Sequence, residues 1–185
     1  MKQVAVFLDR DGTINEEMGY INHLSRFRLL PEAAPAIRRL NDAGLKVVVI
    51  TNQSGAARGY FPPSLVAEVH ARLKALLARE GARVDGIYVC LHGPDDRCAC
   101  RKPKPGLIFQ AAAELDLDLS RSWLVGDRFV DVDTALNAGV KPILVLTGYG
   151  LGEYEQFYGS RKVKPAYVAP NLLEAAAFIL ADQPQ

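Results

Sequence analysis

The stretch Val4-Ala5-Val6-Phe7-Leu8-Asp9-Arg10-Asp11-Gly12-Thr13, at residues 4–13, decides the fold. Its first half is a continuous apolar run, partly β-branched, that stops abruptly at a polar turn. A short run of this kind is typical of a strand buried on both faces of a parallel sheet. We therefore predict a strand over residues 4–8 and a loop that begins at Asp9.

The rest of the chain repeats this alternation of short apolar runs and amphipathic segments. Further strands are predicted over residues 46–50, 86–90, 123–125, 142–146 and 166–168. Helices are predicted over residues 32–43, 62–80, 106–115, 130–138 and 172–180. The alternation indicates an α/β fold with a doubly wound, mainly parallel sheet that is covered on both faces.

The length of 185 residues suits one domain, which we expect to span residues 1–185. Only residues 14–45 separate the first loop from the second strand, which leaves no space for a separate cap domain. The least regular stretches are residues 15–30, 92–105 and 147–164. We derive no role for the last of these.

Composition and charge exclude several classes of partner. The formal net charge is +1 and no Lys/Arg block is present, which argues against a nucleic-acid or membrane surface. No apolar run approaches the roughly 20 residues that span a bilayer, and the first one is too short for a signal peptide. We expect a cytoplasmic monomer that acts on a small phosphorylated metabolite.

Polar groups follow four of the predicted strands. Asp9 and Asp11 follow the first strand, Thr51 the second and Asp127 the fourth, and Lys102 lies in the long loop after the third. Ligands of doubly wound sheets bind outside the carboxyl ends of the strands. The sequence therefore predicts that these five residues converge on one edge of the sheet.

The mixture of three carboxylates, a hydroxyl and a lysine indicates phosphoryl chemistry. Carboxylates 9, 11 and 127 would repel one another unless a divalent cation, most suitably magnesium, lay among them. The cation and Lys102 would stabilise a phosphoryl group. One carboxylate could then attack phosphorus, and a second could protonate the leaving oxygen and deprotonate the attacking water.

Taken singly, each of these residues has an ordinary structural interpretation. The Asp-x-Asp-Gly-Thr string could be a strand-to-turn transition, and Thr51 a helix or turn cap. Lys102 could be solvated, and Asp131 could cap the helix that begins beside it. Their occurrence together, in order and at strand ends, favours the functional interpretation.

Asp9-x-Asp11-Gly12-Thr13, Thr51, Lys102 and Gly126-Asp127-x-x-x-Asp131 together resemble the four motifs of the haloacid dehalogenase superfamily of phosphohydrolases. The resemblance covers essentially the whole chain and implies the Rossmann-like core of that superfamily. It implies Asp9 as nucleophile, Asp11 as general acid/base, and Thr51 and Lys102 as phosphoryl ligands. Magnesium would bind Asp9, the backbone carbonyl of Asp11, and Asp127, with Asp131 orienting these ligands.

A second metal site is predicted in the loop after the third strand. The three cysteines of the chain lie between residues 90 and 100, and Cys90, His92, Cys98 and Cys100 form a C-x-H…C-x-C pattern. A Cys₃His set suits tetrahedral zinc, and closed four-ligand sites are structural. The alternative is one buried cysteine and two exposed thiols. His70 is interpreted as an ordinary helix residue, and His23 stays unassigned.

The zinc-type loop directly before Arg101-Lys102-Pro103, with Thr51-Asn52-Gln53-Ser54, resembles the heptose bisphosphate phosphatases of the superfamily. Histidinol-phosphate phosphatases share the pattern. The resemblance implies substrate contacts from two loops and two arginines: Glu17, Met18, Gly19, Tyr20, Thr51, Asn52, Gln53, Ser54, Arg101, Lys102 and Arg128. Either arginine could instead form an ion pair with a nearby carboxylate.

The reaction implied is hydrolysis of the C7 phosphate of D-glycero-D-manno-heptose 1,7-bisphosphate, in ADP-heptose and lipopolysaccharide core synthesis. Arg101 and Arg128 suit the phosphate that is not cleaved, because a guanidinium grips phosphate through two hydrogen bonds. Histidinol phosphate is the alternative substrate, since Glu17 could bind its amine. Two alternatives of other classes are a nucleic-acid 3′-phosphatase and a non-catalytic zinc-stabilised interaction module.

Overall fold

A six-stranded parallel sheet forms the centre of the computed structural model, which describes residues 2–183; residues 1 and 184–185 of the expected domain lie outside the described residues. The strand order is β3-β2-β1-β4-β5-β6, with every neighbouring pair parallel. The strands are β1 (Ala5–Leu8), β2 (Lys46–Asn52), β3 (Gly86–Cys90), β4 (Trp123–Gly126), β5 (Lys141–Val145) and β6 (Tyr167–Ala169). The predicted fold class is confirmed.

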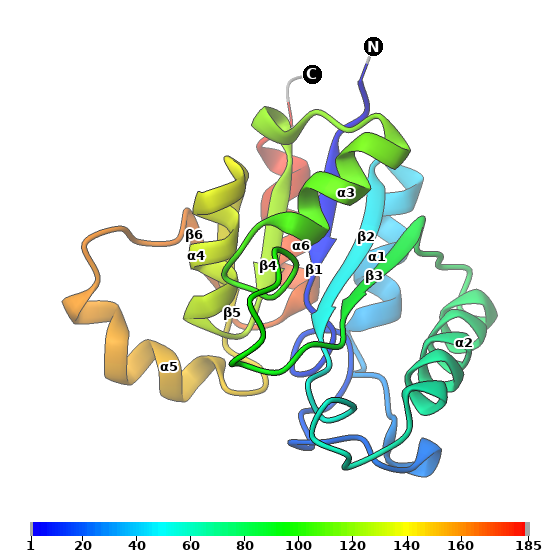
Figure 1. The fold of residues 1–185 in the computed structure, drawn as a ribbon. Helices are drawn as coiled ribbons and strands as arrows, with labels where there is room; N and C mark the ends of the chain where they lie inside the picture. The colour runs from blue at the N-terminus through cyan, green and yellow to red at the C-terminus, as the bar shows by residue number, and fades with distance from the viewer. Residues whose placement is uncertain (1, 184–185) are drawn as a thin grey trace.

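Helices cover both faces of the sheet (Figure 1). They are α1 (Ala33–Asp42), α2 (Pro63–Arg79), α3 (Gly106–Leu115), α4 (Phe129–Ala138), α5 (Gly150–Phe157) and α6 (Leu172–Ala181). Val6 and Leu8 of β1 pack into the core that contains α1, α2 and α6, whereas Ala5 and Phe7 pack into the core that contains α3 and α4. This alternation is the reason why β1 is apolar at every position.

The prediction that residues 147–164 are irregular was wrong, because they contain helix α5. Gly150 and Gly152 weaken its intrinsic helix propensity, and Gly150 is its only buried residue. Its aromatic residues are only partly buried, and Tyr154 packs against the cluster of Phe129, Val132 and Leu144. Contacts from Glu153 of α5 to Arg128 and to the backbone N–H of Phe129 attach the helix to the start of α4.

The strand order places the functional loops beside one another. β1 lies between β2 and β4, so the residues after these three strands share the carboxyl edge of the sheet, which is the lower edge in Figure 1. Chain order reverses between β1 and β4, where such sheets bind ligands. Over residues 2–183, each helix is too short or too polar to cross a bilayer.

Candidate active site

A cavity of about 490 Å³ opens at the carboxyl edge of the sheet. It is lined by nearly all of the predicted catalytic and substrate-binding residues: Asp9, Asp11, Glu17, Gly19, Tyr20, Thr51, Asn52, Gln53, Ser54, Arg101, Lys102, Asp127 and Arg128. Met18 is the exception, because it packs against the hydrophobic core. Sequence reasoning missed Gly55, Arg58, Val130 and Tyr149, which also line the cavity.

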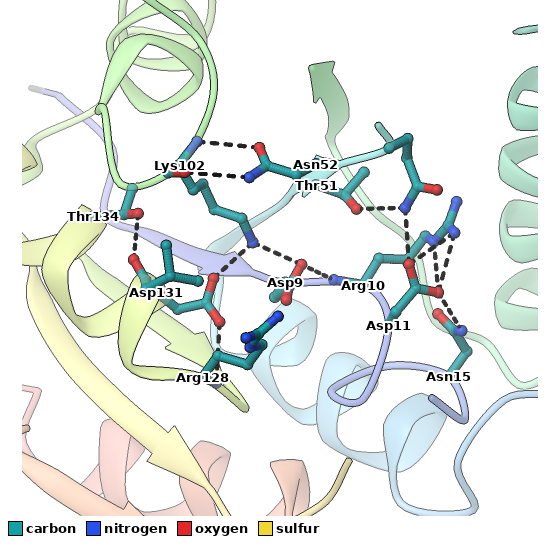
Figure 2. Close-up of polar contacts among 12 residues, drawn as sticks. Asp9, Arg10, Asp11, Asn15, Thr51, Asn52, Lys102, Arg128, Asp131 and Thr134 are labelled. Atoms are coloured by element: carbon teal, nitrogen blue, oxygen red, sulfur yellow. Dashed lines mark hydrogen bonds and ion pairs between the residues drawn. The ribbon is translucent and has the colours of Figure 1, made fainter. Parts of the chain in front are cut away.

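Lys102 is buried between two carboxylates and is not a solvated side chain. Its Nζ lies 2.8 Å from Oδ1 of Asp9 and 2.6 Å from Oδ1 of Asp131 (Figure 2). Burial acts to lower the pKa of Lys102, but the charges of Asp131 and Asp9 outweigh it and hold the pKa above its ordinary value. Asn52 fixes the backbone, since its Oδ1 accepts from the N–H of Lys102 at 3.1 Å.

Asp9, Asp127 and Asp131 form a buried acidic cluster in which one oxygen of each lies within 4.8 Å of the others. Burial, with the charge of Asp131, raises the pKa of Asp9 to about 7. Burial, with the charge of Asp9, raises the pKa of Asp127 to about 9. Asp9 and Asp127 resist ionisation in the protein alone, because burial and the neighbouring negative charges both disfavour the charged form.

The cluster fits a magnesium ion. Within residues 2–183, Oδ1 of Asp127 is buried without a hydrogen-bond partner, whereas its Oδ2 accepts from the N–H of Tyr149 at 2.8 Å. An orphaned carboxylate oxygen beside Asp9 is a ligand position of the kind that a hard cation occupies. Asp131 is differently placed, since Oδ1 pairs with Lys102 and Oδ2 accepts from the N–H of Arg128 at the start of α4. Its helix-cap contact and its ion pair with Lys102 therefore coexist.

The side chain of Asp11 turns away from the acidic cluster toward Arg10 and Asn15 (Figure 2). Gln53 joins it to the phosphoryl-ligand position, because Nε2 of Gln53 lies 2.8 Å from Oδ2 of Asp11 and 2.9 Å from Oγ1 of Thr51. Burial acts to raise the pKa of Asp11, but the charge of Arg10 and hydrogen bonds from Asn15 and Gln53 lower it below its ordinary value. The pKa of Asp11 is thus shifted in the direction opposite to the pKa values of Asp9 and Asp127.

The turn after β5 packs against the loop after β1 and against Asp127, and no sequence pattern predicts these contacts. Oγ1 of Thr147 donates to the carbonyl of Gly12 at 2.6 Å, and Gly148 adopts a φ of 57° against Asp127. A Cβ on Gly148 would lie 2.2 Å from Oδ2 of Asp127, so only glycine fits. The close approach of three backbone segments holds the Asp127 carboxylate in place.

Three arginines line the cavity, with different partners. Nε of Arg128 lies 3.2 Å from Oε1 of Glu153, and its guanidinium lies 5.2 Å from the centre of the Tyr149 ring. Arg128 therefore forms an ion pair with a nearby carboxylate, which was the alternative to a phosphate contact. Nη1 of Arg101 donates to the carbonyl of His92 at 3.3 Å. Among residues 2–183, the exposed guanidinium of Arg58 makes no hydrogen bond or ion pair.

The predicted zinc ligands converge at the end of β3. Sγ of Cys90 lies 2.8 Å from Sγ of Cys100 and 3.8 Å from Sγ of Cys98, and Nδ1 of His92 lies 3.2 Å from Sγ of Cys100. All four ligand atoms lie within 4.8 Å of one another, and the three cysteines are free thiols. The chemistry of this donor set fits a closed tetrahedral zinc site.

Comparison with known proteins agrees with this geometry. Residues 99–175 match a family model described as HAD-hydrolase-like. The chain is 44% identical to D-glycero-D-manno-heptose-1,7-bisphosphate 7-phosphatase of Thermosynechococcus vestitus, over 97% of this chain and 96% of that protein. It is 45% identical to D-glycero-beta-D-manno-heptose-1,7-bisphosphate 7-phosphatase of Pseudomonas aeruginosa, over 82% and 85%. The chain belongs to the haloacid dehalogenase (HAD) phosphatases.

A solved HAD phosphatase resembles the structure over its whole length. The D,D-heptose 1,7-bisphosphate phosphatase of B. bronchiseptica, complexed with magnesium and phosphate, superposes with a TM-score of 0.89 and 38% identity. The alignment covers 99% of this chain and 100% of that one. The chain is thus a phosphoric monoester hydrolase with the HAD fold, and magnesium is the cofactor that this family and the acidic cluster support.

Proposed function

We propose that this HAD phosphatase hydrolyses the C7 phosphate of D-glycero-D-manno-heptose 1,7-bisphosphate, which places it in ADP-heptose and lipopolysaccharide core synthesis. The names of its relatives support this substrate. The observation that carries the proposal is the cavity, whose lining combines the carboxylates of Asp9 and Asp127 and the ammonium group of Lys102 with three arginines. Such a cavity suits a small substrate with two phosphates, one to be cleaved and one to be retained.

Asp9 is the proposed nucleophile, and it lies at the end of β1 beside the charged Nζ of Lys102. Its carboxylate would attack phosphorus, while Asp11, after taking a proton from solvent in the substrate complex, would give that proton to the leaving sugar oxygen. Water would then attack the aspartyl-phosphate and give its proton to Asp11. Thr51 and Lys102 would hold the phosphoryl oxygens. Magnesium, held by Asp9, Asp127 and the backbone carbonyl of Asp11, supplies positive charge at the phosphoryl group.

The phosphate that is not cleaved is assigned to the arginines that line the cavity. Arg101 and Arg58 are the best suited, because Arg101 contacts only a carbonyl and Arg58 has no ion-pair partner among the described residues. Arg128 already pairs with Glu153, so phosphate must compete for it. Arg58 is thus added to the substrate contacts expected from sequence.

The test compares kcat/KM, with magnesium, for heptose 1,7-bisphosphate, heptose 7-phosphate and histidinol phosphate. We expect preference for the bisphosphate, and we expect Arg58→Ala and Arg101→Ala to lower its kcat/KM by roughly 10–100-fold, the worth of one or two charge-assisted hydrogen bonds. Both variants should leave the heptose monophosphate nearly unchanged. Arg121→Ala, an exposed position before β4 at the opposite edge of the sheet, is the matched control.

Histidinol phosphate is the competing substrate because Glu17 lines the same cavity. Oε1 of Glu17 accepts from the N–H of Gly19 at 2.5 Å, and burial raises its pKa. Both features make this carboxylate less available to an amine. A preference for histidinol phosphate would show that this compound is the substrate, and it would leave the roles of the catalytic residues unchanged.

We further propose a single domain over residues 1–185 that works as a cytoplasmic monomer, with zinc fixing the loop beside Arg101. Four converging donors support the zinc proposal. The near-neutral charge supports a small phosphorylated metabolite as partner and argues against nucleic acid and membrane surfaces.

A further inference from the structure

Arg10 is a charged residue that is almost completely buried directly beside the proposed nucleophile. Only 1% of its surface is exposed, and it lies outside the lining of the cavity. Burial of a guanidinium costs free energy unless its donors are satisfied. The groups that contact the Arg10 guanidinium therefore indicate why it is buried.

The first partner is the carboxylate of Asp11. Nη2 of Arg10 donates to both Asp11 oxygens, at 3.0 Å to Oδ1 and 2.9 Å to Oδ2, and Nε lies 3.3 Å from Oδ1. Nδ2 of Asn15 and Nε2 of Gln53 each add a hydrogen bond of 2.8 Å. The carboxylate is thus held from three sides, and Arg10 supplies most of the contacts.

The second partner is His70, in the middle of α2 and 60 residues further along the chain. Nη1 of Arg10 lies 3.2 Å from Nε2 of His70. A guanidinium has only donors, so Nε2 must accept, and the imidazole is neutral with its proton on Nδ1. His70 therefore holds Nη1 of the guanidinium, while Nε and Nη2 contact Asp11.

We propose that Arg10 and His70 are positioning residues for acid–base catalysis: His70 orients the guanidinium, and the guanidinium holds the Asp11 carboxylate at the cavity. The inference rests on the proposed function, since it takes Asp11 as the acid/base. Arg10 acts only through Asp11 because it lies outside the cavity. Lysine would keep the charge but lacks the planar fork that contacts both oxygens.

The two halves of the reaction require Asp11 differently. In the first half the bond from phosphorus to the leaving oxygen breaks, the bond from phosphorus to Asp9 forms, and Asp11 protonates the leaving oxygen. In the second half water bonds to phosphorus, the bond to Asp9 breaks, and Asp11 takes the water proton. A nitrophenolate leaves without protonation, so p-nitrophenyl phosphate needs Asp11 only in the second half.

The experiment is rapid-mixing and steady-state hydrolysis of p-nitrophenyl phosphate with magnesium, per folded active site. For Arg10→Lys we expect one equivalent of nitrophenolate in the first turnover and a steady-state kcat lowered by about 100-fold, the lower end of general acid–base contributions. His70→Leu should lower kcat by about tenfold, as loss of an outer-shell partner does. KM should fall in parallel with kcat in both variants, because slowing only the second half leaves kcat/KM unchanged.

Matched variants separate positioning from folding. His70→Gln keeps a side-chain acceptor for Arg10 and should restore kcat to within about twofold of wild type. Arg72→Gln, at an exposed position of the same helix, should behave as wild type. If Arg10→Lys does not fold, the His70→Leu and His70→Gln pair carries the test alone.

Two results would overturn the inference. One is an unchanged steady-state kcat in Arg10→Lys or His70→Leu. The other is loss of the first turnover and of the steady state in equal proportion, which marks a purely structural role. Failure of the proposed function would be seen separately. If the enzyme does not hydrolyse heptose bisphosphate, the substrate proposal fails, but p-nitrophenyl phosphate still tests the roles of Arg10 and His70. If Asp9→Asn retains the first turnover, the aspartyl-phosphate mechanism is wrong.

Discussion

Single residues in this site have sharply different charge states because their neighbours differ. Burial and mutual repulsion raise the pKa values of Asp9 and Asp127, whereas the charge of Arg10 outweighs burial and lowers the pKa of Asp11, two residues from Asp9. The same Arg10 also acts on His70: burial, followed by the charge of Arg10, lowers the pKa of His70 from 6.5 to about 4. Burial and the Arg10 guanidinium thus both lower the pKa of His70, and the same guanidinium lowers the pKa of Asp11.

The pKa of His70 predicts a pH-dependent part of the stability. Between pH 4 and 6.5 the unfolded chain binds a proton at His70 that the folded protein excludes. Stability from this group is therefore complete above pH 6.5 and is lost as the pH falls toward 4, by about 2–3 kcal/mol in all.

Urea unfolding of the wild type and of His70→Gln from pH 4 to 8 isolates this contribution. The raised pKa values of Asp9 and Asp127 act in the opposite direction, but they are common to both proteins and cancel in the difference. Parallel stability curves for the two proteins over this range would show that His70 does not titrate as stated.

At the scale of elements, the turn between β5 and α5 predicts an effect of a single methyl group. Gly148→Ala would place a Cβ against Asp127 in a left-handed conformation, which costs roughly 1–2 kcal/mol before any clash. We expect a lower Tm and loss of both activity and the Tm increase that magnesium produces, because Asp127 must shift.

Gly152→Ala, one turn into α5, is the matched control. A Cβ there has no heavy atom within 4 Å, and alanine favours the helix by roughly 1 kcal/mol. Its activity and its response to magnesium should equal those of wild type. Equal behaviour of the two alanine variants would contradict the assigned role of the turn.

The loop between β3 and α3 predicts dependence on zinc. Cys90, Cys98 and Cys100 bring their thiols together with His92 around one position in this loop. At a thousandfold excess over its Kd, zinc would stabilise the fold by about 4 kcal/mol. A zinc chelator or Cys98→Ser should therefore lower Tm, at roughly 2–4 °C per kcal/mol for this chain length. Equal midpoints with and without chelator would contradict a structural zinc site.

At the scale of the whole molecule, strand positions and strand-end residues were predictable from sequence. Continuous apolar runs mark buried strands, and a parallel sheet brings their carboxyl ends to one edge, so Asp9, Thr51 and Asp127 meet in one cavity. Contacts between distant segments were not predictable. His70 looked like an ordinary helix residue because nothing local indicates a contact 60 residues away.

Two further features lacked a local signal. Helix α5 is only eight residues long and contains two glycines, and the turn at Gly148 is explained only by its approach to Asp127. The partner of Arg128 was left open between phosphate and a carboxylate, and Glu153, 25 residues along, is the carboxylate. Periodicity reports which residues are buried, but the pairing of polar groups depends on the finished fold.

The central claim is that Asp9 is the nucleophile of a magnesium-dependent phosphatase. The measurement that tests it most directly is the rate of phosphate release from heptose 1,7-bisphosphate with magnesium, for wild type and Asp9→Asn. We expect Asp9→Asn to remain folded with a Tm at least equal to that of the wild type, because it removes one carboxylate from the buried acidic cluster. Its phosphate release should fall at least about 10⁴-fold, as expected when a nucleophile is removed. Substantial phosphate release by folded Asp9→Asn would contradict the claim.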